Sequence, residues 1–159
     1  MTPYAFFLDL RTWLRGLVWT GTTNKIFGDN VYIVPTFPMQ QLARLQSPTC
    51  FIADLGASVN PIHPQLLDQN FSIAIWLSNV QSEWGEGSIL SACRTVNTSL
   101  GAGLLQIENE LLPQIYKNTA LSSTKIMIVE KAKTRLELTQ NNFPLVSRVW
   151  TFSCLLSFI

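Results

Sequence analysis

The residue types that most often carry out catalysis are sparse in this chain and are not grouped. The single histidine, His63, lies between two prolines in the segment PIHP, and the cysteines are Cys50, Cys93 and Cys154. A cysteine and a histidine can act together as nucleophile and base. No local signature and no third orienting group accompanies them here, so we interpret His63 as a surface or loop histidine. We expect the cysteines to be small buried hydrophobic side chains.

The acidic residues do not form a general acid–base pair. Glu108 and Glu110 are two positions apart, whereas neighbours on a helix surface are three or four apart. We therefore expect both to lie on a solvated or interface edge. Asp54, in DLG, and Asp29, in GDN, have the surroundings of ordinary turn acids.

Metal and phosphate sites are also disfavoured. The three cysteines are widely spaced, no CxxC pair occurs, and there is one histidine, which argues against a zinc site and a disulfide framework. The segments GEGSILS and GAG contain glycine but lack the P-loop and dinucleotide-binding patterns. We predict no catalytic, cofactor-binding or metal residues and no enzymatic activity.

The composition limits the class of protein. Only 13 % of the 159 residues are charged, against roughly 25 % in soluble domains. Hydrophobic residues make up 47 %, which excludes a disordered chain. The low content of Glu, Lys and Arg excludes a coiled coil, and no apolar run reaches the 18 or so residues of a membrane helix. One globular domain, residues 1–159, is predicted.

The neutral surface points to assembly. A surface poor in Lys, Glu and Asp resembles the core of a permanent interface. The alternative is compositional drift in a low-charge proteome. General nucleic-acid binding is disfavoured, because the net charge is only +1. The one basic cluster, Lys131 to Arg135, is also flanked by Glu130 and Glu137. The N-terminal segment does not have the pattern of a secretion signal, because Asp9 and Arg11 interrupt it. Free thiols then indicate a reducing cytoplasm.

Hydrophobic spacing predicts the elements that would position these residues. The expected order is a helix at 3–17, strands at 31–35, 49–55 and 68–79, a long loop at 80–103, a helix at 104–117, and strands at 125–138 and 143–159. Residues 56–67, which contain two prolines, are expected to form a loop. The helices are too few for a doubly wound parallel sheet. The prediction is an α+β fold with a mostly antiparallel or mixed sheet, two main helices packed on one face and a long protruding loop.

Several single positions carry sharper expectations. Trp76 lies on the small, polar face of its strand, so a helix or a partner must cover that face. Pro113 conflicts with the second helix and should kink or shorten it. A bend or break is expected near Lys131. The last strand has no lysine along 149–159, so it is either central in the sheet or paired with a neighbouring subunit.

The loop at 80–103 holds the candidate interaction residues. Loops of this length in a compact domain are either functional or disordered. Trp84 and Arg94 are of types that anchor interfaces, and Ile89 and Leu90 lie between them. The alternative for Trp84 is that it folds back on its own domain.

The succession of these pieces resembles the tail terminator and neck (head–tail joining) proteins of long-tailed bacteriophages. The resemblance covers nearly the whole chain and rests on element order rather than on a diagnostic motif. The matching segments are Pro3–Leu17, FGDNVYIVP at 27–35, TCFIADLG at 49–56, DQNFSIAIWLSN at 68–79, GAGLLQIENELLPQIY at 101–116 and VSRVWTFSCLLSFI at 146–159.

The resemblance implies a virion protein that forms a homo-hexameric ring. Such a ring caps the tail tube, stops its polymerisation and docks the head connector, while genomic DNA passes through the lumen without sequence-specific binding. The protein would assemble in the cytoplasm of the bacterial host, with no membrane partner. The family has no catalytic residues to carry over. This chain lacks the strong acidity of several members.

Other functions remain open at this point. A tail tube or other neck or connector subunit of related fold would form tubes or a different ring. A small cytoplasmic enzyme using cysteine and His63, or a monomeric binding module, would need no assembly.

Deletion of residues 82–92 tests the loop prediction. We expect rings to form but tail capping to be lost, because the loop would contact the tube or the connector. Tail length measured by electron microscopy is the readout. Normal tails assembled with the deleted protein would rule out a capping role for this loop.

Overall fold

The computed structural model describes residues 1–35, 48–77, 103–117, 121, 126–138 and 144–158. Its helices are α1 (Pro3–Gly16) and α3 (Leu104–Lys117), and its strands are β1 (Val31–Val34), β2 (Thr49–Val59), β3 (Leu66–Leu77), β4 (Ile126–Leu138) and β5 (Pro144–Ser157). These elements form an α+β fold with a mixed sheet, as predicted, and follow the predicted order. The expected loop at 80–103 falls almost wholly outside the described residues.

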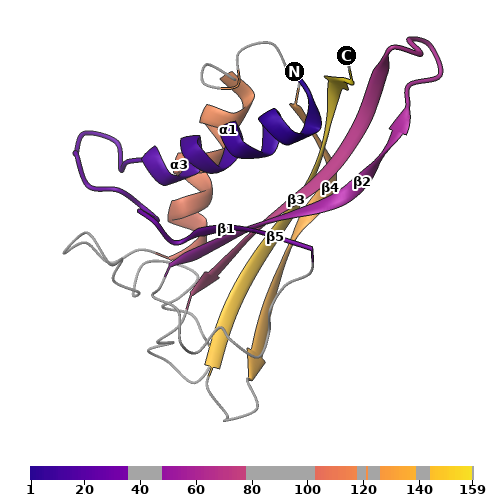
Figure 1. The fold of residues 1–159 in the computed structure, drawn as a ribbon. Coiled ribbons are helices and arrows are strands. Elements are labelled where there is room, and N and C mark those ends of the chain that lie inside the picture. Colours follow the sequence, from indigo (N-terminus) through magenta and orange to yellow (C-terminus); the bar gives the residue numbers. More distant parts are fainter. Residues whose placement is uncertain (36–47, 78–102, 118–120, 122–125, 139–143, 159) are drawn as a thin grey trace.

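The five strands form one sheet in the order β1-β2-β3-β5-β4. β1 runs parallel to β2, and the other three neighbouring pairs are antiparallel. β5 therefore lies inside the sheet, between β3 and β4 (Figure 1). This position settles the two alternatives for the last strand: it needs no lysine because its edges are already paired.

The first helix begins with a cap and carries a buried stripe. Thr2 Oγ1 accepts a hydrogen bond from the Ala5 amide at 3.4 Å, and Pro3 occupies the first turn, where its missing N–H removes no helical hydrogen bond. Phe6, Phe7, Leu10 and Leu14 are the buried residues of α1. Tyr4 in the first turn is 77 % exposed, and the buried face begins at Phe6.

The second helix extends past its proline. Pro113 lies inside α3, which runs on to Lys117, so the expected shortening is wrong. The residue whose carbonyl loses a helical hydrogen bond at Pro113 is Asn109, four positions earlier. Both residues are exposed, so water can solvate the freed carbonyl. The apolar stripe of α3, at helical spacing, is buried: it consists of Leu104, Ile107, Leu111 and Ile115.

Both helices pack on the same face of the sheet (Figure 1). The alternate residues Phe71, Ile73, Ile75 and Leu77 of β3 all belong to this buried core, as the alternation of a strand requires. Phe71 links the layers, because its ring stacks on Phe152 of β5 and meets Phe6 of α1 edge-on, each at 5.2 Å between centroids. The helix α1 is therefore held to the sheet by aromatic contacts as well as by aliphatic packing.

A second, smaller cluster lies on the other face of the sheet. It consists of Phe51, Ala74 and Trp76, with Tyr32 and Val149 packed against it among the partly buried residues. Trp76 is only 4 % exposed, and its ring meets Phe51 edge-on at 6.5 Å. Trp76 is thus buried within the single chain. Both described helices lie on the other face, so the cover by a helix or a partner that was expected here stays a prediction.

Half of the loop expected at 56–67 is strand. β2 continues to Val59 and β3 begins at Leu66, so only residues 60–65 form the turn. β2 continues past Gly56 because a β-bulge shifts its register with β3 between Asp54 and Gly56. Gly56 has φ +93°, which only glycine adopts without strain. Asn60 Oδ1 accepts from the amides of Ile62 and His63, which confines the two prolines to the turn.

The strand β4 confirms the prediction for residues 125–138. Its pairing with β5 is irregular between Ile128 and Glu130 and again between Glu130 and Lys133. These irregularities fall where a bend was expected near Lys131. An edge strand with such bulges twists away from a second sheet.

Substitution of Gly56 by alanine tests the role of the bulge. No neighbouring atom lies within 4 Å of a Cβ built at Gly56, so only the positive φ opposes Gly56→Ala. We expect a loss of about 1–2 kcal/mol in the free energy of unfolding, measured by urea denaturation. Gly16→Ala is the matched control, since it is equally unobstructed but helical. It should be neutral or stabilising by up to about 1 kcal/mol; equal effects of the two changes would contradict the argument.

Candidate interaction surface

The four loop residues proposed from the sequence are not placed by the structure. Trp84, Ile89, Leu90 and Arg94 all lie within 78–102, outside the described residues. Their role as interaction contacts therefore stays a prediction.

The structure separates Cys50 from the histidine. Cys50 and Cys154 are buried free thiols, as predicted, and Cys93 lies outside the described residues. Burial raises the pKa of the Cys154 thiol to about 12 and the pKa of Cys50 well above its usual range. His63 is exposed in the β2–β3 turn, which confirms the loop assignment. Cys50 lies nine residues before the end of β2, about 30 Å of strand from that turn.

In the described part of the chain, no group of three or more His, Cys, Asp or Glu residues could hold a metal ion. Among the same residues, no helix is long and apolar enough to cross a membrane.

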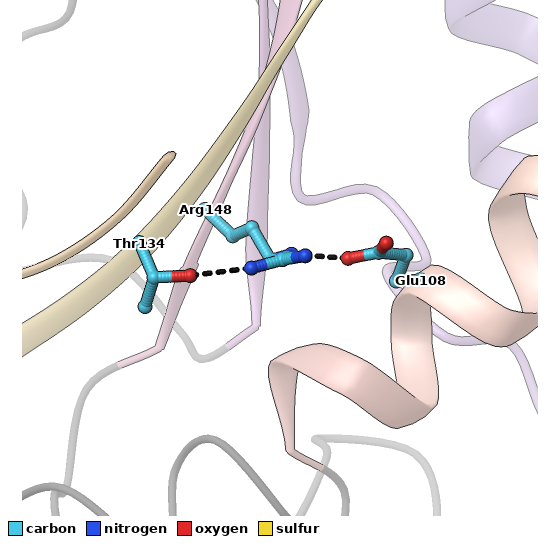
Figure 2. A network of polar contacts seen from close by, with 3 residues as sticks. All are labelled: Glu108, Thr134 and Arg148. Carbon is cyan, nitrogen blue, oxygen red and sulfur yellow. Dashed lines mark hydrogen bonds and ion pairs between the residues drawn. The ribbon is translucent and has the colours of Figure 1, made fainter. Parts of the chain in front are cut away.

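A charged contact joins α3 to the covered face of the sheet. Figure 2 shows Arg148 of β5 between Glu108 of α3 and Thr134 of β4. Arg148 Nε forms an ion pair with Glu108 Oε2, and Nη1 donates to Thr134 Oγ1 at 2.6 Å. The guanidinium also lies 5.9 Å from the centre of the Trp150 ring, within range of a cation–π interaction. Arg148, the exception on an otherwise apolar strand face, therefore has a partner for its charge.

This contact corrects the expectation for Glu108 but not the one for Glu110. Glu108 is only 19 % exposed and is paired, so it does not lie on a solvated edge. Glu110 accepts from the hydroxyl and the amide of Thr20, at 2.7 and 3.3 Å, in hydrogen bonds that are exposed to solvent. The two carboxylates diverge, as the helical spacing predicts, and each ties α3 to a different part of the protein. The distance in sequence between the partners explains why the pattern alone did not reveal the contacts.

The turn acids also serve local structure. Asp54 Oδ1 accepts from the Gly56 amide and from Gln69 Nε2, each at 2.8 Å, so this carboxylate closes the bulge rather than a turn. Gln69 is 2 % exposed, and its amide also donates to the Gly56 carbonyl at 3.0 Å. Asp29 is exposed, and its carbonyl accepts from the Val31 amide at 2.9 Å, as expected of a turn.

Beyond the bulge, the β2–β3 hairpin carries exposed apolar side chains. All six β2 residues from Asp54 to Val59 are exposed. Leu55 is 53 % exposed, Val59 58 %, and Ile62 in the turn 78 %. Figure 1 shows this hairpin reaching past the end of α1. Large side chains of this type normally lie inside a protein, so their concentration on one hairpin marks a candidate interaction surface.

The chain ends lie at the same end of the sheet. Ser157 pairs with Leu66 at the start of β3, and its amide donates to the Met1 carbonyl at 3.0 Å. Phe158, 48 % exposed, and Tyr4 of the first helical turn therefore lie near the hairpin. We call Tyr4, Leu55, Val59, Ile62 and Phe158 the apolar end. They are five of the six exposed large hydrophobic residues in the described ranges; the other is Ile33.

The sequence held a weak signal for this surface. The run LGASV at 55–59 has a β-branched residue and no charge, but Gly56 and the nearby prolines favoured a loop. The hairpin becomes visible only once β3 supplies the partner strand.

No protein-family model matches the chain, and no curated protein sequence matches it. The surface and the fold are therefore the observations from which a function can be argued.

A double-mutant cycle tests how α3 is held to the sheet. Glu108→Gln and Arg148→Gln should each lower the free energy of unfolding by about 1–3 kcal/mol, because each leaves a half-buried partner without its counter-charge. The double variant should lose clearly less than the sum of the two. Glu110→Gln, two residues away on the same helix, should cost less than about 1 kcal/mol because its contacts are exposed. Simple additivity in urea denaturation would show that the ion pair contributes nothing.

Proposed function

We propose that the protein is a structural virion subunit that assembles into a hexameric ring capping a bacteriophage tail tube and joining it to the head connector. The apolar end is the observation that carries the assembly part of this proposal. Five large hydrophobic side chains at one end of the sheet are poorly suited to a free monomer and well suited to a protein contact.

The low charge supports the same conclusion. With 13 % charged residues and a net charge of +1, little electrostatic repulsion opposes association of identical copies. The exposed β2 residues beyond Asp54 carry no charge at all, so burying them against a neighbour requires no desolvation of ions. The electrostatic and ion-desolvation costs of assembly on this surface are therefore small.

The tail and neck assignment rests on the resemblance in element order, now joined by the α+β fold with a mixed sheet. The proposed partners are further copies of the chain, the tail tube protein and the head connector. Genomic DNA would pass through the lumen without sequence-specific binding, which suits a chain with little net charge. The place of action would be the tail or neck of the virion, after assembly in the host cytoplasm.

A tail tube or other neck subunit is the alternative within the same class. The apolar end would serve a stacked tube as well as a single ring. Rings and tubes differ in whether growth stops, which microscopy of the purified protein distinguishes. An enzyme that uses Cys50 and His63 is disfavoured by the buried thiol and by the length of strand between the two residues.

Electron microscopy and native mass measurement test the ring. We expect closed rings whose mass is a multiple of the 17.9 kDa chain, six copies per ring. Ile62→Asp should weaken assembly at least tenfold, because a carboxylate replaces an exposed isoleucine that becomes buried on contact. Gln65→Asp is the matched control, with the same new charge on an exposed polar residue of the same turn, and should assemble normally.

Three results would count against this function. A wild-type monomer at about 100 µM would exclude obligate assembly, and Ile62→Asp assembling like the wild type would exclude the apolar end as the contact. Long tubes without added partners would favour the tail tube subunit instead.

A further inference from the structure

The two edges of the sheet are protected unequally. β4 forms one edge, and its sequence contains Lys131, Lys133 and Arg135, while two register irregularities interrupt its pairing with β5. Charged residues and bulges are the usual means of preventing a further strand from pairing. The β4 edge is therefore protected against association.

The opposite edge is stepped. β1 pairs with residues 50–53 of β2 and ends at Val34. Beyond that point, β2 continues to Val59 with β3 on one side only, as far as the described strands extend, and with every side chain exposed. Residues 55–59, LGASV, contain no lysine, no proline and no charge. We call this stretch the open edge.

Backbone N–H and C=O groups of the open edge point away from β3, where another strand could pair with them. The Asn60 amide donates to the Leu66 carbonyl at 2.9 Å, so Asn60 faces β3. Because backbone groups alternate along a strand, Ser58 also faces β3, and the N–H and C=O groups of Ala57 and Val59 face outward. An added strand would find two donors and two acceptors in a row.

We propose that the open edge pairs antiparallel with the open edge of a second copy of this chain, with Ala57 facing Ala57 across a two-fold axis. This contact uses Leu55 and Val59 of the apolar end, but its two-fold geometry differs from that of a contact between neighbours in a ring. A two-fold contact joins two copies and leaves no further contact of the same kind free. It can therefore join two subunits or two whole rings, but it cannot close a ring.

The self-complementary sequence favours a second copy over an unrelated strand. In this register, Val59 of each copy lies opposite Leu55 of the other, which forms two apolar cross-strand pairs. The nearest charged residue, Asp54, comes to lie beside the neutral Asn60 of the second copy, so no two carboxylates meet. Small residues, Gly56 and Ser58, occupy the other side and leave room for close approach of the strands.

A charge-swap experiment tests the register as well as the contact. Ala57→Lys places two ammonium groups directly opposite each other, and Ala57→Glu places two carboxylates there, so each variant alone should show half the wild-type mass in sedimentation velocity. An equimolar mixture of the two should recover the wild-type mass, because the opposite charges then face each other. Gln65→Lys, a new charge on an exposed turn residue outside the open edge, should keep the wild-type mass.

The outcomes are decisive in both directions. Recovery in the mixture also demonstrates that both variants fold. An unchanged mass for Ala57→Lys, or a mixture that stays at half mass, would overturn the two-fold pairing. Rings of unchanged mass in both variants would overturn this contact but would leave the proposed ring function unaffected. Wild-type dimers that form no rings, and that the single variants dissociate, would support this contact and contradict the ring function.

Discussion

The sheet of this protein is longer than the helices that cover it. α1 and α3 have 14 residues each, about 21 Å of helix, whereas the 12 residues of β3 span about 40 Å. The contact of Phe6 with Phe71, whose ring stacks on Phe152, holds α1 over part of the sheet only. The uncovered length must either be polar or be covered by another protein, and the apolar side chains on the β2–β3 hairpin favour the second.

The bulge at Gly56 decides what this uncovered length presents. One extra residue in β2 reverses which backbone groups face outward, and Asp54 and Gln69 satisfy the polar groups that the distortion exposes. The hairpin is thus a hydrogen-bonded extension of the sheet rather than a loop. A surface held in this way loses little conformational entropy when it binds, which favours a stable contact.

Charge is scarce in the chain and has structural uses where it occurs on the covered face. Arg148 lies where the strand pattern calls for an apolar residue, and Glu108 with Thr134 compensates its burial. The basic residues in the sequence of β4 coincide with the protected edge. Residues 55–59 of the hairpin are exposed and carry no charge, which connects the unusual composition with a place in the fold.

Local patterns determined much of the fold. The stripe of Leu104, Ile107 and Leu111 and the alternation of Phe71, Ile73 and Ile75 identify their elements because helices and strands repeat with different periods. These periods also predict which faces are buried and that Glu108 and Glu110 diverge. The periods do not predict which element packs against or pairs with which, because these contacts depend on residues far away in the chain.

Only the tertiary structure decided the rest, and the physical reason is the same in each case. β5 became a central strand because β3 and β4 pair with both of its edges. Arg148 found Glu108 forty positions away, and Trp76 was buried against Phe51 of the neighbouring strand. Residues 55–59 became strand because β3 supplies their hydrogen bonds and the bulge at Gly56 absorbs the irregularity. The sequence by itself determined the elements and their buried faces; the long-range contacts decided which edges and which end of the sheet remain available to another protein.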